Sequence, residues 1–181
     1  MLLKKDGNIT LRKFGIQDIE KKVEWINNHR NNKYLHYDLP LQVDKTVQWF
    51  AKVKDLKSRL DAVITCNDAA IGLIGLLNID DKNKKAEFYI CIGEESARGC
   101  GIAKKASVLL LDYAFNELRL NRIYLYTEQE NVSAQKLFEK LGFKKEGLIE
   151  QDLIYNGRFV NRYMYGLLEE AYKNDCSNSN K

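Results

Sequence analysis

Apolar residues recur along the chain at two spacings, and each spacing predicts a different kind of element. Alternation of polar and apolar residues predicts a strand over 9–14, and short runs bounded by turn residues predict strands over 60–66, 70–79, 85–92, 122–127, 147–155 and 159–168. Apolar residues three and four apart predict helices over 18–27, 44–57, 102–118 and 131–142. Short polar turns separate the strands between residues 60 and 92, which predicts an antiparallel meander. The strand at 122–127 follows a helix and is expected to lie parallel to 85–92 through a right-handed crossover.

Turn and capping residues place the boundaries of these elements. Asp44 is expected to cap the helix that follows it, and Asn131 to cap the last helix. Asn156-Gly157 is a strong hairpin signal between the last two strands. The segment 28–43 is rich in Asn and Tyr and holds the only proline, and long polar loops of this kind often bind ligands.

Composition bounds the class of protein. The 181 residues are 45% hydrophobic, which suits one domain over 4–173 followed by a polar, disordered tail at 174–181. The net charge of +4 is spread along the chain, so no nucleic-acid partner is expected. No apolar run reaches the length of a membrane span. Four widely spaced cysteines and two histidines predict no metal site, and we expect a cytoplasmic protein that is a monomer or homodimer.

A glycine-rich loop lies between the strand at 85–92 and the helix at 102–118, with the sequence Arg98-Gly99-Cys100-Gly101-Ile102-Ala103. Two glycines allow a tight turn, and the start of a helix adds unpaired N–H groups, which together make a site for phosphate. A Walker loop is excluded because no Gly-Lys-Ser/Thr triplet closes the motif. A dinucleotide-binding fingerprint is excluded because Lys104 stands where the third glycine would be.

The spacing Arg-x-x-Gly-x-Ala resembles the acyl-CoA pyrophosphate loop of the GNAT superfamily of N-acetyltransferases. The segment 131–143 is similar to a second signature of that family, Asn-x-x-Ala-x-x-Leu-Tyr/Phe-x-Lys-x-Gly-Phe. Segments 25–35 and 155–168 resemble the RimJ/RimL-type branch. The resemblance covers residues 9–172 and implies an α+β fold, in which about four helices flank a twisted, mixed, mostly antiparallel sheet of six to seven strands.

The resemblance implies direct transfer of an acetyl group from acetyl-CoA to a primary amine. In that family the strand before the loop splays from its neighbour, so free N–H groups near residues 90–92 would bind the pantetheine arm and the carbonyl oxygen. Loop amides would hold the pyrophosphate, Arg98 or Lys104 would add charge at its rim, and Asn131 would contact the pantetheine. The implied cofactor-binding residues are Ile90, Cys91, Ile92, Arg98, Gly99, Cys100, Gly101, Ile102, Ala103, Lys104, Asn131 and Phe138.

Deprotonation of the amine is the largest energetic demand of this reaction. A lysine-like amine has a pKa of about 10.4, so presenting it neutral at pH 7 costs about 4–5 kcal/mol, against about 1–1.5 kcal/mol for an α-amine. Glu87 is the one carboxylate inside the apolar strand at 85–92, and members of the family often carry a glutamate here that acts through water. The alternative is that Glu87 lies on an exposed face of the sheet.

Departure of the thiolate makes a smaller demand, about 2 kcal/mol at pH 7. Many relatives supply the proton from a tyrosine of the helix at 131–142, but this chain has Phe138 at that position. Either solvent assists the leaving thiolate, or a hydroxyl of Ser133, Tyr126 or Tyr163 takes over.

The acceptor is expected to bind beside the loop at 28–43, through His36, Tyr37 and Glu87, although ordinary loop polarity would also explain the first two. Asn, His and Tyr residues suit a small polar amine such as an amino sugar or a nucleotide-linked amino sugar. The segment lacks the acidic cluster that a polyamine would favour. An acetyltransferase of protein N-termini and a non-catalytic acyl-CoA-binding protein are the alternatives.

Overall fold

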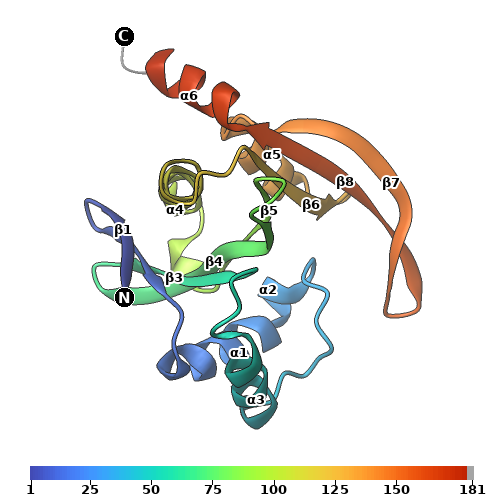
Figure 1. Cartoon of the computed structure of the whole chain (residues 1–181). Helices are drawn as coiled ribbons and strands as arrows, with labels where there is room; N and C mark the ends of the chain where they lie inside the picture. Colours follow the sequence, from blue (N-terminus) through green and yellow to red (C-terminus); the bar gives the residue numbers. More distant parts are fainter. Residues whose placement is uncertain (179–181) are drawn as a thin grey trace.

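The computed structural model describes residues 1–178, with side chains described through residue 174. Its strands are β1 (Leu2–Asp6), β2 (Ile9–Lys13), β3 (Leu60–Cys66), β4 (Ala69–Asp80), β5 (Lys85–Ile92), β6 (Arg122–Glu128), β7 (Lys144–Tyr155) and β8 (Arg158–Leu168). Its α-helices are α1 (Ile19–Asn27), α2 (His29–Asn32), α3 (Val43–Val53), α4 (Ile102–Asp112), α5 (Val132–Lys140) and α6 (Glu169–Asn178), as Figure 1 shows.

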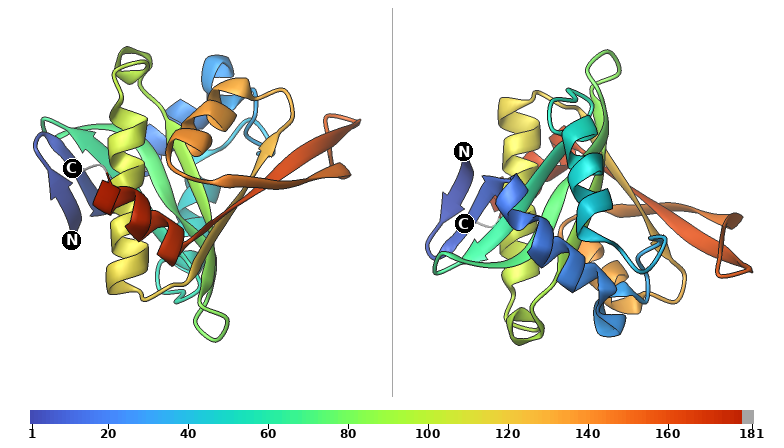
Figure 2. Two further views of the ribbon diagram at one scale, coloured as in Figure 1. Left: turned by 90° about the horizontal axis from the view of Figure 1, so that it is seen from above. Right: turned by 90° about the horizontal axis from the view of Figure 1, so that it is seen from below.

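The eight strands form one sheet in the order β1-β2-β3-β4-β5-β6-β8-β7. Neighbouring strands are antiparallel except β5 and β6, which run parallel as expected. Helices α1 and α3 cover one face of the sheet and α4 covers the other (Figure 2). This arrangement confirms the expected mixed, mostly antiparallel sheet flanked by helices, with one strand more than the largest number expected.

Alternate side chains of the central strands face two hydrophobic cores. Val63 and Leu73 point toward α1, where they pack in one cluster with Trp25. Ile64 and Ile74 belong to the larger cluster, which contains the buried side chains of α4. Since these four strand residues are at most 4% exposed, both faces of the sheet are closed, and the strands that carry the site rest on a packed platform.

The two ends of the chain depart most from the expected elements. β1 precedes the first expected strand and pairs with β2 through a turn at Gly7, whose φ is +56°. Two adjacent leucines and two adjacent lysines in β1 do not alternate, so the sequence pattern carries no strand signal there. At the other end α6 continues to Asn178, so the expectation of a disordered tail is wrong for residues 174–178. Residues 179–181 of that tail lie outside the described residues.

Two helix boundaries also differ from the expectation. α3 begins at Val43 after an extended Gln42, so Asp44 lies within the first turn and is not the N-cap. Its charge still lies near the positive end of the helix dipole. The helix expected over 102–118 is α-helical only to Asp112 and continues as a π-helical turn, Tyr113–Glu117. Among residues 1–178, we find no helix with the length and apolar character that crossing a membrane requires.

Candidate active site

β5 and β6 pair only at the start of each strand. Their ladder joins Lys85, Ala86 and Glu87 to residues 122–124 and then ends. Beyond that point β5 stays paired with β4 as far as Ile92, and β6 stays paired with β8. Residues 88–92 and 125–128 therefore diverge, and we call the gap between them the wedge. Backbone groups of β5 that would otherwise bond to β6 are open to a ligand there, as the resemblance implied.

The glycine loop leads from the open end of the wedge into α4. Gly99 and Gly101 both have a φ of +75°, a left-handed conformation that glycine adopts without strain. A Cβ atom built on either glycine would meet nothing within 4 Å, so the space in front of the loop is free. No side chain caps α4, whose first N–H groups are thus available. The loop fits an anionic group such as the diphosphate of coenzyme A.

Arg98 bonds the glycine loop to the end of β5 and to α2 from the surface of the protein. Its guanidinium donates to the side-chain oxygen of Asn31, and to the carbonyl oxygens of Ile92 at 3.2 Å and Arg30 at 3.4 Å. The same Asn31 donates to the carbonyl oxygen of Gly93 at 2.8 Å. Arg98 is therefore not a freely solvated arginine, because its guanidinium donates to three protein oxygens, and its contact with the pyrophosphate stays a prediction. The sequence did not single out Asn31, because it is one of four asparagines between residues 27 and 32.

The remaining loop residues lie at its surface. Cys100 is exposed, with its Sγ 3.5 Å from the carbonyl oxygen of Arg98. Lys104 is exposed in the first turn of α4, and Ile102 and Ala103 precede it at the start of the helix. Lys104 also borders a cavity between α4 and β1, together with Lys4 and Lys5.

α5 borders the wedge on the side of α4. Asn131 caps this helix as expected, since its Oδ1 accepts from the backbone N–H of Ala134 at 3.3 Å and from the hydroxyl of Ser133 at 3.1 Å. Phe138 is 6% exposed and packs against Phe88, with ring centroids 6.2 Å apart. Phe138 is therefore a core residue at the base of the wedge, in addition to lacking a hydroxyl.

The polar side chains beside the wedge lie mostly on the face of the sheet that points away from α4 and α5. Glu87 and Cys91 share this face of β5, and Tyr124 shares it because it pairs directly with Glu87. Tyr126 follows Tyr124 along β6, and their rings meet edge to face at 5.8 Å. Tyr163 lies on the other face, where the ammonium of Lys145 is 3.7 Å from its ring centroid. Of the hydroxyl groups expected as proton donors, Tyr126 shares the face of Glu87 and Tyr163 does not.

Two protonated groups line this face deeper in the protein. Burial, with smaller contributions from the neighbouring Cys91 and Asp61 and an opposing one from Arg59, raises the pKa of Tyr37 to about 12. Burial also raises the pKa of the Cys91 thiol to about 11. The Tyr37 hydroxyl and the Cys91 thiol therefore keep their protons at neutral pH and can act only as hydrogen-bond donors or as uncharged lining of the site. Neither is suited to be a base or a nucleophile, which leaves Glu87 as the base candidate on this strand.

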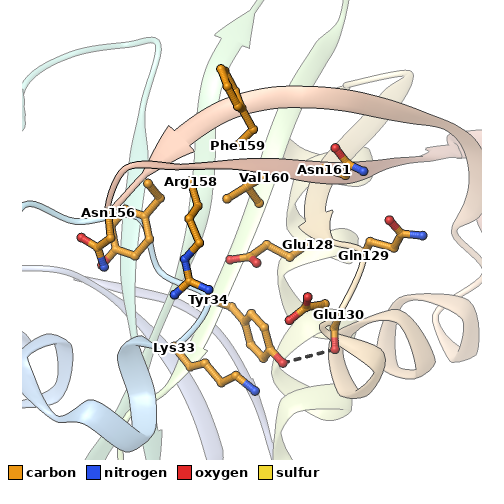
Figure 3. A pocket seen from close by; sticks show the side chains of 11 residues that line it. Lys33, Tyr34, Glu128, Gln129, Glu130, Asn156, Arg158, Phe159, Val160 and Asn161 are labelled. Atoms are coloured by element: carbon orange, nitrogen blue, oxygen red, sulfur yellow. Dashed lines mark hydrogen bonds between the residues drawn. The ribbon is translucent and has the colours of Figure 1, made fainter.

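His36 spans the mouth of the wedge. Its Nε2 lies 2.8 Å from the Oε1 atom of Glu128 at the end of β6, and its ring meets that of Tyr155 at 5.1 Å. Next to this contact lies a cavity of about 430 Å³, which we call the hairpin cavity. It lies between the segment after α2, the end of β6 and the β7–β8 hairpin (Figure 3). Its lining residues are Lys33, Tyr34, Glu128, Gln129, Glu130, Tyr155, Asn156, Arg158, Phe159, Val160 and Asn161.

The hairpin cavity carries charges of both signs. Figure 3 shows the carboxylate of Glu128 and the guanidinium of Arg158 directed into it, and the hydroxyl of Tyr34 donates to the carbonyl oxygen of Glu130 at 3.2 Å. Sequence reasoning brought His36 to this site and missed Glu128 and Glu130. Both glutamates stand where a strand ends before a helix cap, a position at which polar residues are ordinary, so only their pairing with a distant loop distinguishes them.

Comparison with known proteins gives consistent results. Residues 8–144 match the acetyltransferase (GNAT) domain family. The chain is 31% identical over 169 residues to the uncharacterized N-acetyltransferase p20 of Bacillus licheniformis, covering 91% of this chain and 94% of that protein. It is 31% identical over 180 residues to the putative ribosomal N-acetyltransferase YdaF of Bacillus subtilis, covering 95% and 97%. The crystal structure of spermidine N-acetyltransferase from Vibrio cholerae in complex with CoA and spermine superposes with a TM-score of 0.85 at 28% identity, covering 93% and 99%.

Proposed function

Because this chain belongs to the GNAT acetyltransferase family, we propose that it transfers the acetyl group of acetyl-CoA to a primary amine of an aliphatic polyamine. The resemblance to a spermidine N-acetyltransferase over 93% of the chain is the observation that carries this choice of acceptor. The amino sugar expected from the loop at 28–43 is given up, since the acidic groups absent from that loop come instead from β6. Assembly as a monomer or homodimer, and a cytoplasmic location, stay predictions.

Acetyl-CoA would lie along the wedge. The free N–H groups of the glycine loop and α4 would hold its diphosphate, with the ammonium of Lys104 beside them. Backbone N–H groups near Ile90 and Ile92 would bind the pantetheine arm and the carbonyl oxygen, where negative charge grows during transfer. Asn131 has a side-chain amide left over from capping, which supports a second contact to the pantetheine.

Glu87 would remove the proton from the attacking amine, directly or through one water. It stands at the last paired position of β5 and β6, where the two strands begin to separate. Its side chain is half-buried on the face opposite Phe138, so an amine can approach the thioester from that side. Removing this base should slow the reaction more than the lack of an acid does, because presenting a lysine-like amine in its neutral form at pH 7 costs about 4–5 kcal/mol.

Glu128 and Glu130 would hold a second ammonium group of the acceptor. Glu128 lies four residues along β6 from the partner of Glu87, a distance of about 13 Å for extended strand. A flexible chain with several amines can place one amine near Glu87 and another in the hairpin cavity. An amine with a single charge would use only one of the two sites.

Thiol release from acetyl-CoA tests the proposal with a panel of polyamines, amino sugars and peptides. We expect turnover of spermidine or spermine, and an increase of about tenfold in their KM for Glu128→Gln, because a charged partner is lost. Glu20→Gln is the matched control, since this exposed carboxylate on α1 is outside the wedge. Turnover of amino sugars without turnover of any polyamine would contradict the proposal.

A peptide α-amine is the second candidate acceptor. The hairpin cavity also contains Lys33 and Arg158, which would repel a polyamine but attract an acidic or carboxylate-bearing chain. The similarity to a putative ribosomal N-acetyltransferase, and the residues that resemble the RimJ/RimL-type branch, support this candidate. Arg158→Gln separates the two: it should lower the KM of a polyamine and raise the KM of an acidic peptide.

A further inference from the structure

A β-bulge in β4 lies directly beside Glu87. Leu77 pairs with Glu87 and Asp80 pairs with Lys85, so two residues of β4, Asn78 and Ile79, lie opposite Ala86 alone. The N–H of Ile79 donates to the carbonyl oxygen of Ser58 at 2.9 Å, which anchors the bulge from the other side. Such bulges redirect a side chain that would otherwise alternate with its neighbours.

Asn78 occupies the bulge in a left-handed conformation, with a φ of +49°. Glycine would adopt this φ at lower cost, and asparagine is among the few other residues that tolerate it. If the bend alone mattered, glycine would serve better. An asparagine at this position is therefore best explained by what its amide contacts.

That amide contacts two groups at the narrow end of the wedge. Its Nδ2 donates to the Oε2 atom of Glu87 at 2.9 Å. Tyr124 pairs with Glu87 across β5 and β6; burial and the charge of Glu87 raise its pKa, and its contact with Asn78 lowers it. One amide thus lies beside a carboxylate of β5 and a phenol of β6, at the position where these strands last pair.

We propose that Asn78 is a positioning residue that fixes Glu87 and Tyr124 as a pair at the narrow end of the wedge. The inference rests on the proposed function, in which Glu87 takes the proton of the amine. By donating to Glu87, the amide fixes the direction of the carboxylate. Its contact with Tyr124 keeps the phenol beside this carboxylate. Asn78 itself touches neither the thioester nor the amine.

Asn78→Gly is the decisive substitution, because it keeps the left-handed backbone and removes only the amide. We expect kcat to fall about tenfold with KM for the amine changed less than twofold, since a bond to a charged group is lost without loss of a binding contact. Asn67→Gly is the matched control: Asn67 has a φ of +48° in the turn before β4, away from the wedge. Glu87→Gln supplies the other arm of a double-mutant cycle.

The cycle decides between positioning and general stability. If Asn78 acts through Glu87, Asn78→Gly should have little further effect in the Glu87→Gln background. Equal losses in both backgrounds, or equal losses for Asn78→Gly and Asn67→Gly, would overturn the proposal. Rescue of kcat by Asn78→Gln, which restores an amide, would support it.

A nuclear magnetic resonance experiment tests the same contact without any acceptor. The side-chain amide signals of Asn78, assigned by their loss in Asn78→Gly, should shift with pH in the wild-type protein and remain constant in Glu87→Gln. They should also shift in Tyr124→Phe. Asn78 amide chemical shifts that are unchanged by both substitutions would overturn the inference even if polyamines are acetylated. Signals that respond to both would support it even if the acceptor turns out to be another amine.

Discussion

The side-chain amide of Asn31 lies 2.8 Å from the carbonyl oxygen of Gly93, which it meets as a hydrogen-bond donor. The oxygen of the same side chain accepts from Arg98. One asparagine of α2 therefore connects Gly93, the residue that follows β5, to Arg98 at the start of the glycine loop. The position of the glycine loop therefore depends on α2, a helix on the side of the molecule where the acceptor is expected to bind.

Asn31→Ala should weaken coenzyme A binding by about fivefold, because two anchors of the loop are lost while every backbone donor remains. Isothermal titration calorimetry with coenzyme A measures this directly. Asn32→Ala is the control, since Asn32 belongs to the same short helix and its side chain makes no hydrogen bond to the described residues of the loop. Equal affinities for the two variants would show that Asn31 does not organise the loop.

Gly93→Ala should destabilise the fold by about 1–3 kcal/mol through overpacking. A Cβ atom on Gly93 would lie 2.2 Å from ring atoms of Trp25, whose indole N–H is held by Glu94. Thermal denaturation measures the loss, at about 2–4 °C per kcal/mol for a chain of this size. Gly147→Ala provides the contrast, because a Cβ there meets nothing within 4 Å. A Gly93→Ala protein as stable as Gly147→Ala would contradict the close packing.

The central part of the fold and the cofactor loop were predictable because their signals are local. Short apolar runs bounded by turn residues indicate β3 to β5, and paired glycines before an apolar helix indicate the loop around Gly99 and Gly101. Asn156-Gly157 makes the expected hairpin turn, with φ values of +49° and +73°. Each of these features needs only neighbours in sequence, so the pattern of residues contains it.

The acceptor side could not be read from the sequence because its contacts are distant. Glu128 meets His36 across 92 residues, and nothing near either residue indicates the pair. In the sequence Asn78 is one polar residue near the end of the strand expected over 70–79, and only the bulge brings its amide to Glu87. The acidic groups of the hairpin cavity come from the end of β6 and the turn after it rather than from the loop at 28–43, which is why the loop alone favoured a small polar amine such as an amino sugar over a polyamine.

Gly101→Ala and Gly157→Ala should separate the cofactor role of a glycine from its conformational role. Both glycines have left-handed φ values, +75° and +73°, and open space around them. Each substitution should cost about 1–2 kcal/mol of stability for the strained backbone. Only Gly101→Ala should also weaken coenzyme A binding, by about tenfold or more, because its methyl group would occupy the space in front of the loop. Similar affinities for both variants would place the diphosphate elsewhere.

Lys22 makes the stability of the fold depend on pH. This residue is 5% exposed, and its ammonium lies 3.4 Å from the ring centroid of Trp49. Burial lowers its pKa to about 8 from the ordinary value of 10.5. Between these two values the unfolded chain binds more protons than the folded one, so stability rises with pH. We expect a gain of about 1 kcal/mol from pH 8 to pH 9.

Urea denaturation of wild type and Lys22→Met at pH 8 and pH 9 measures that gain. The variant keeps a side chain of similar length against Trp49 and removes the titrating group, so its stability should change less over this interval. Lys21→Met is the control, because exposed Lys21 pairs with Glu24 and its pKa is raised, out of the interval. Above pH 9 the raised pKa values of Cys91 and Tyr37 act in the opposite direction, since the unfolded chain loses those protons first. A wild-type curve that is parallel to that of Lys22→Met between pH 8 and pH 9 would mean that the Lys22 ammonium is not desolvated in the folded protein.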